Sequence, residues 1–282
     1  MAPPREGELN MAKSVAADPK RIRPPAVAGR FYPGDPVELR NLINALLAQA
    51  PPATRPAPKA LNAPHAGYLY SGPIAASAYA QLLPARDLIK RVVLFGPSHY
   101  VALTGVAATS AEGFATPLGV VPVDAEALRR ILSLPQVTIL DEAHANEHSL
   151  EVQLPFLQTV LSGFALVPLA VGDATAEEIG QILDALWDGP ETRFVISSDL
   201  SHYHDYQTAR RLDRATAKAI EALKPGGIGE DQACGRISIR GLLQAARRRG
   251  LRARTVDLRN SGDTAGPRDK VVGYGAFALE ES

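Results

Sequence analysis

The chain alternates between amphipathic helical patterns and short apolar runs. Residues 35–50 place Leu39, Ile43 and Leu46 on one helical face, and Asp35 precedes them as an N-cap. The same periodicity predicts further helices over 71–83, 124–132, 147–161, 175–187, 206–223 and 235–250. Because Pro155 cannot continue a helical ladder, we expect it to interrupt the helix at 147–161.

The apolar runs between these helices are typical of strands buried on both faces. They predict strands over 59–64, 91–96, 104–110, 164–172, 193–199, 252–258 and 270–279. Strands and helices that alternate in this way predict an α/β fold. We therefore expect a three-layer αβα sandwich, with helices on both faces of a mostly buried mixed sheet.

Composition narrows the class of protein. The 282 residues carry 30 basic and 30 acidic side chains, so no net positive charge favours nucleic-acid binding. The longest apolar stretch, at 164–171, is far shorter than the roughly 20 residues of a membrane helix. Residues 1–22 are polar, lack a signal-peptide core and predict a disordered tail. We expect a cytoplasmic protein with a single domain over 23–282 that contacts neither nucleic acid nor membrane.

Polar side chains with metal-binding chemistry stand at the ends of three predicted strands. His65, His99 and Asp199 each lie where a strand ends, and His202 follows Asp199 closely. Ligands of open α/β sheets bind beyond the carboxyl ends of the strands. Since the chain has only six histidines, this pattern indicates a shared site. Each residue also has a structural interpretation: a lone histidine is more often a hydrogen-bonding group, and Asp199 could cap a helix.

Two more residues are candidates for the same site. His148 lies just inside a predicted helix, between Glu147 and Glu151. Cys234, the single cysteine, lies at a predicted helix start, where backbone dipoles favour the thiolate. Imidazole suits Zn, Cu, Fe and Ni, and thiolate suits the softer of these metals. Cys234 taken alone also fits a small buried apolar position. One cysteine excludes an intrachain disulfide and any zinc site that needs several cysteines.

Several motifs occur in one order and together resemble the Memo family, whose bacterial and archaeal members are called AmmeMemoRadiSam system protein B. The motifs are PPAVAGRFYPGDP, APHAGYLYSGP, FGPSHY, EHSLEVQLPFLQ, SSDLSHYH, ACG, NSGD and VVGYGAFAL. The resemblance runs from about Arg23 to Leu279. The Memo family is similar in fold to the LigB-type (class III) extradiol aromatic-ring dioxygenases, which are α/β sandwiches with a non-haem Fe(II) site. The resemblance therefore implies a LigB-like fold with a metal pocket.

The resemblance also implies roles for individual residues. It implies that the metal ligands are His65, His99 and Cys234. It places Asp199 and His202 in the pocket. In the hypothesis that we favour, His202 serves as acid/base, and Asp199 orients it or contacts substrate. His148 is a further candidate for the pocket wall. The dioxygenases carry a carboxylate where this chain has the cysteine, and thiolate changes metal preference and redox potential. We expect Fe(II), with Cu or Zn as alternatives.

Three functions are open at this point. The first is a metal-dependent redox protein that acts on a small molecule in a dioxygenase-like pocket. The second is a non-catalytic module that binds phosphopeptides or protein partners, because eukaryotic members look like adaptors and this chain has 23 arginines against 7 lysines. The third is metal-assisted hydrolysis. The family name further implies a radical SAM protein and an AMMECR-type protein as partners.

Overall fold

The main sheet is mixed and carries its parallel strands at the centre. The computed structural model describes residues 21–281, so nearly all of the predicted tail at 1–22 lies outside the described residues. Within the described range the sheet has nine strands, in the order β10-β12-β2-β9-β3-β8-β4-β7, with β11 beside β12. Their bounds are β2 Ala60–Ala63, β3 Arg91–Pro97, β4 Val106–Ala108, β7 Val137–Ile139, β8 Ala165–Val171, β9 Thr192–Ser197, β10 His202–His204, β11 Arg252–Asn260 and β12 Val271–Glu280.

Strands β2, β9, β3 and β8 run parallel, and the two sides of the sheet add antiparallel neighbours. Leu94 of β3 lies between Val195 of β9 and Pro168 of β8. β12 is antiparallel to β2, and β4 is antiparallel to β8. The central strands read as unbroken apolar runs because both of their faces are covered. A small separate sheet joins β1 (Ile22–Arg23), β5 (Gly113–Thr116) and β6 (Gly119–Pro122).

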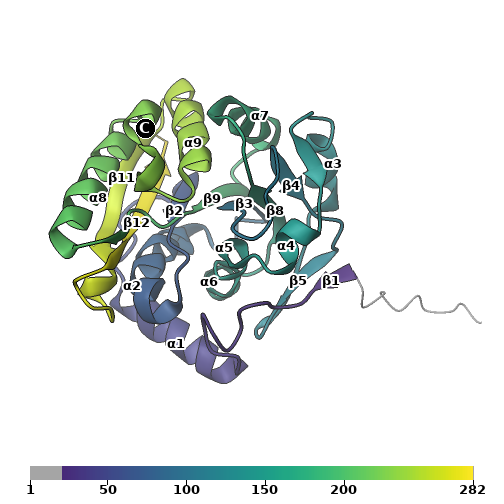
Figure 1. Ribbon diagram of the computed structural model, residues 1–282. Helices are drawn as coiled ribbons and strands as arrows, with labels where there is room; N and C mark the ends of the chain where they lie inside the picture. Colours follow the sequence, from purple (N-terminus) through teal and green to yellow (C-terminus); the bar gives the residue numbers. More distant parts are fainter. Residues whose placement is uncertain (1–20, 282) are drawn as a thin grey trace, which may run out of the picture.

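Helices cover the main sheet on two sides (Figure 1). Their bounds are α1 Pro36–Gln49, α2 Tyr68–Tyr79, α3 Ala125–Ile131, α4 Glu142–Ala145, α5 His148–Glu151, α6 Leu154–Val160, α7 Ala176–Leu186, α8 Tyr206–Glu221 and α9 Arg236–Arg248. Helices α3, α7, α8 and α9 lie along one side, and α1, α2, α5 and α6 lie along the other (Figure 1).

Two apolar cores confirm the predicted αβα sandwich. One core packs side chains of α1, α2 and α6, among them Ile43, Ile74 and Phe156, against one face of the sheet. The other packs side chains of α7 and α9, among them Ile182 and Leu242, against the opposite face. Burying apolar area on both faces at about 25 cal/mol per Å² holds the three layers together.

The segment predicted as one helix at 147–161 is two short helices. α5 ends at Glu151 and α6 begins at Leu154, so the break falls before Pro155. The expected interruption is present: α5 ends four residues before Pro155, whose ring clashes with the carbonyl of a helical residue at that position. Pro155 itself lies in the first turn of α6, where an N–H has no helical partner. No helix in the described part of the chain combines the length and apolarity of a membrane span.

Candidate metal site

Three neighbouring parallel strands bring the candidate side chains to one edge of the sheet. β2 ends at Ala63, β3 at Pro97 and β9 at Ser197. His65, His99 and Asp199 each follow one of these strand ends by two residues. Because the carboxyl ends of parallel strands meet at one edge, residues far apart in sequence become neighbours there.

Three imidazoles form the centre of this site. His65, His99 and His148 each offer a ring nitrogen, and these atoms lie within 4.8 Å of one another. His99 and His148 stack with ring centroids 4.6 Å apart, and His65 meets both rings edge-on at 5.2 and 5.5 Å. Three imidazole nitrogens at this spacing can share one transition-metal ion.

Ser197 fixes the orientation of His65. Its Oγ lies 2.9 Å from His65 Nδ1, accepts from Gln153 Nε2 at 2.8 Å and donates to the Ser149 carbonyl at 2.6 Å. A hydroxyl has only one hydrogen to donate, so Nδ1 must donate to Ser197 and Nε2 keeps its lone pair. Burial, followed by the charge of His99, lowers the pKa of His65 to about 3, so the ring is neutral at neutral pH. A neutral imidazole is the metal-binding form.

Glu147 does for His99 what Ser197 does for His65. One carboxylate oxygen lies 2.9 Å from His99 Nδ1, and the other accepts the His99 backbone N–H at 2.6 Å. Ser149 N also donates to the first oxygen at 2.8 Å. Burial opposes ionisation of Glu147, but the hydrogen bonds from His99 outweigh it and lower the pKa to about 2. A carboxylate that orients an imidazole through Nδ1 leaves Nε2 free and more basic toward a metal.

His148 supplies a buried ring nitrogen without a partner. Among the described residues its Nδ1 makes no hydrogen bond, and Glu147 Oε1 lies 3.5 Å away. Burial, followed by the charge of His65, lowers the pKa of His148 to about 4. Buried polar atoms are nearly always satisfied, so an orphaned imidazole nitrogen beside two oriented imidazoles fits a metal ligand. The residues present therefore suit a transition-metal ion.

Cys234 lies at the edge of the same cluster. Its Sγ is 3.3 Å from His65 Nε2, within the roughly 3.1 to 3.6 Å that separates S and N ligands of one ion. Burial, followed by the negative charge of Asp199, raises the pKa of the thiol to about 12. Burial and Asp199 therefore favour the protonated thiol, contrary to the thiolate expected at a helix start. Binding a metal through Cys234 would release its proton.

Asp199 and His202 line the cavity next to the imidazoles. Asp199 Oδ1 accepts the His65 backbone N–H at 2.8 Å, and Oδ2 lies 4.0 Å from His65 Nε2. Burial raises the pKa of Asp199 above its usual value. Asp199 caps no helix, since the N-cap of α8 is Asp205. The cavity measures about 760 Å³ and also contacts Tyr70, Tyr100, Tyr203 and Lys270.

The sequence patterns did not single out the two side chains that orient the imidazoles. Ser197 reads as a turn residue, and Glu147 reads as a helix acid beside His148. Glu147 is in fact the N-cap of α5 and also reaches His99, which is 48 residues away. The one available signal is the charge pattern EHSLE, where a carboxylate directly precedes a candidate ligand.

The structure is thus an α/β sandwich with three imidazoles at its strand ends, close enough together to hold a metal ion. A family model described as "Memo-like protein" matches residues 23–278. A "MEMO1 family protein" of Aquifex aeolicus is 36% identical over 90% of this chain and 97% of its own length. Relatives of the same description from Aeropyrum pernix and Methanopyrus kandleri are 38% and 37% identical, covering 92% and 91% of this chain and 100% and 98% of their own lengths. This chain belongs to the Memo family.

Proposed function

We propose that the protein is a metal-dependent oxidoreductase that acts on a small molecule in a dioxygenase-like pocket. The observation that carries the proposal is the group of His65, His99 and His148, whose ligand atoms lie within 4.8 Å of one another. Ser197 and Glu147 point the Nε2 atoms of two of these rings away from their hydrogen-bond partners. Histidines that bind a metal almost always donate their other ring N–H to a partner of this kind, which fixes the tautomer and the orientation of the ring.

The metal in this proposal is Fe(II), with Cu and Zn as alternatives. Its ligands are His65 and His99, together with Cys234, His148 or both. Imidazole accepts all three metals, and a thiolate ligand would shift the preference toward the softer ones. When bound, Fe(II) or Cu would supply one-electron chemistry toward oxygen or a substrate, whereas Zn would act only as a Lewis acid. Single variants His148→Gln and Cys234→Ser identify the third ligand, because the true ligand's variant loses more metal on elemental analysis.

The remaining residues of the pocket would handle substrate and protons. His202 lines the cavity and is suited to act as acid/base, since an imidazole can both donate and accept a proton. Asp199 is held by the His65 backbone N–H, so one carboxylate oxygen is positioned and the other faces the cluster. A volume of about 760 Å³ lies in the range of small-molecule sites.

Oxygen uptake tests this function. Protein loaded anaerobically with Fe(II) is mixed with oxygen and a panel of catechol-like substrates. We expect substrate-dependent uptake that falls about 100-fold in His202→Gln, the size of a lost general acid/base, and changes little in the neighbouring His204→Gln. Turnover that needs the metal but consumes no oxygen would replace the proposal with metal-assisted hydrolysis. Uptake that is the same in His202→Gln and wild type would contradict the role of His202.

A second candidate function is a binding module for phosphopeptides or protein partners. It is favoured by the rim of the cavity, where Lys270 lies among exposed aromatic rings of Tyr70, Tyr100 and Tyr203. Such a rim can hold an anionic peptide without chemistry. Calorimetry with phosphorylated and unphosphorylated peptides tests this function, with Lys270→Met as the variant. Partnership with radical SAM and AMMECR-type proteins belongs to the proposal through family membership. A cytoplasmic location belongs to it through the composition of the chain.

A further inference from the structure

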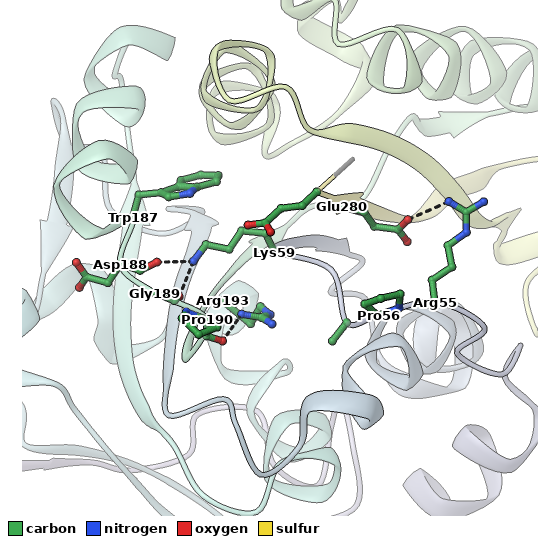
Figure 2. Close-up of a pocket in the computed structure, with 11 residues that line it drawn as sticks. Arg55, Pro56, Lys59, Trp187, Asp188, Gly189, Pro190, Arg193 and Glu280 are labelled. Atoms are coloured by element: carbon green, nitrogen blue, oxygen red, sulfur yellow. Dashed lines mark hydrogen bonds and ion pairs between the residues drawn. The ribbon is translucent and has the colours of Figure 1, made fainter.

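A second cavity lies at the opposite edge of the sheet. It measures about 730 Å³, and Lys59 and Arg193 point into it (Figure 2). Lys59 directly precedes β2 and Arg193 is the second residue of β9, so both lie where these parallel strands begin. His65 follows Lys59 by six positions of extended chain, at about 3.3 Å per residue, so the two sites lie about 20 Å apart. This cavity is therefore separate from the metal cluster.

Lys59 keeps one unused donor. The residue is only 6% exposed, and its Nζ donates to the carbonyls of Asp188 and Gly189 at 2.6 and 2.9 Å. A lysine ammonium has three hydrogens, so one remains. The two bonds fix the ammonium against the loop that follows α7, and Nζ also lies 5.6 Å from the centroid of the Trp187 ring and 5.7 Å from that of Phe194. The third N–H makes no hydrogen bond among the described residues, so a phosphate can accept it.

Arg193 keeps most of its donors. It is 6% exposed, and its Nη1 donates to the carbonyls of Pro190 and Thr192 at 2.6 and 3.0 Å. Nε is buried and makes no hydrogen bond within residues 21–281, and no hydrogen bond involves Nη2 there. Since Nε is buried, Nη2 is the donor that Arg193 leaves for a ligand in the cavity.

Neither cation has a counter-ion among the described residues. No carboxylate oxygen lies within 4.0 Å of either one in that part of the chain, whereas Arg55 in the same cavity pairs with Glu280 at 3.1 Å. Burial, followed by the charge of Arg193, lowers the pKa of Lys59 to about 8. Buried cations are normally paired, because desolvating an isolated charge is costly. Three carboxylates also line the cavity, but Asp188 pairs with Arg91 and Arg130, and Glu280 pairs with Arg55 and Arg254. Glu281 alone is then left to offset the two cations.

We propose that this cavity binds a small molecule through a phosphate group. The phosphate would accept from the free N–H of Lys59 and from Nη2 of Arg193. A phosphate monoester carries close to two negative charges at neutral pH, and hydrogen bonds from charged donors to it are stronger than neutral ones. The volume leaves room for an organic group larger than the phosphate itself.

Calorimetric titration with inorganic phosphate tests the assignment. We expect saturable binding to the wild type that is weakened about tenfold or more in Arg193→Met, the effect of losing hydrogen bonds to a charged group. Arg55→Met is the matched control and should change the affinity less than about twofold, because an exposed, paired charge contributes little. Acetate at equal concentration should bind much more weakly.

Because Arg193 also bonds two carbonyls, a second variant keeps the test decisive if Arg193→Met fails to fold. Glu281 is exposed, and its charge acts on both Lys59 and Arg193. Glu281→Gln should tighten phosphate binding about twofold. Equal affinity in wild type, Arg193→Met and Glu281→Gln would overturn the proposal. So would phosphate binding that is lost in His99→Ala instead, or acetate binding as tight as phosphate binding.

Discussion

Glu147 and Glu151 lie one helical turn apart, at the two ends of α5, and both carboxylates are buried. They nevertheless contact different regions of the molecule. Glu147 faces the imidazole cluster and accepts from the side chain and backbone of His99. Glu151 faces the N-terminal segment, pairs with Arg23 and accepts the backbone N–H groups of Ala26 and Val27. One carboxylate orients a candidate metal ligand, and the other fastens a segment of the fold.

The difference lies in the partner rather than in the residue or its burial. The charge of Glu151 is neutralised by the buried guanidinium of Arg23. The interactions of Glu151 therefore stabilise the position of Arg23 and of the chain that follows it. Glu147 has no lysine or arginine within 4.0 Å among residues 21–281, and its charge acts on the His99 ring. Removing either carboxylate should therefore affect a different property, stability for Glu151 and metal affinity for Glu147.

The largest expected effect is the loss of Glu151. Glu151→Ala leaves Arg23 buried without its counter-ion, and removing one member of a buried pair typically costs about 3 to 5 kcal/mol. We expect the free energy of unfolding, measured by chemical denaturation, to fall by that amount. The exposed pair of Arg21 and Glu112 is the control, and Glu112→Ala should cost less than about 1 kcal/mol. An equal loss of unfolding free energy in Glu151→Ala and Glu112→Ala would contradict the stabilising role assigned to Glu151.

Asp213 on α8 extends the comparison to a buried carboxylate that no lysine or arginine approaches within 4.0 Å in the described chain. It accepts the Ser201 backbone N–H at 3.0 Å, and burial raises its pKa from 3.8 to about 6. The folded state thus prefers the neutral acid, so the free energy of unfolding should fall as the pH rises through this window. The fall is at most roughly 3 kcal/mol.

Asp213→Asn is neutral at every pH and should remove this part of the pH dependence. Chemical denaturation at about pH 4 and about pH 7 measures it, because the two values bracket most of the titration. We expect the variant to gain stability relative to wild type at the higher pH and little at the lower one. A wild-type and variant difference that is independent of pH would contradict the raised pKa of Asp213.

The smallest expected effect in free energy is on metal affinity. Glu147→Gln keeps the shape of the side chain but removes the charge that acts on His99, and loss of such a partner weakens metal binding about 10-fold to 100-fold. Competition with a chelator measures the affinity. Glu142→Gln on neighbouring α4 is the control, since Glu142 is exposed, and should leave the affinity unchanged. Unchanged affinity in Glu147→Gln would mean that His99 does not bind the metal.

Most of the fold could be predicted from the sequence, because apolar runs and amphipathic helical faces are local signals. The central strands β3, β8 and β9 and the long helices α1, α7 and α8 lie where their patterns predict them. The short strands β5, β6, β7 and β10 were not predicted, because three or four residues carry too little periodicity. The break between α5 and α6 was predicted at Pro155 and falls just before it, because a proline fits the first turn of a helix.

The candidate site could be predicted from the sequence only in part. His65 and His99 stood out because they follow apolar strands, and the structure brings both rings together with His148. Ser197 and Glu147 did not stand out, because their roles depend on partners 132 and 48 residues away. Contacts of this range arise from the order of strands in the sheet, which no local pattern reveals.

The most direct test of the central claim is the metal content of protein purified without chelator. We expect elemental analysis to find close to one transition-metal ion per wild-type chain and almost none in the His65→Ala, His99→Ala double variant, with both proteins folded by circular dichroism. Equal metal content in the two proteins would contradict a metal site at the strand ends.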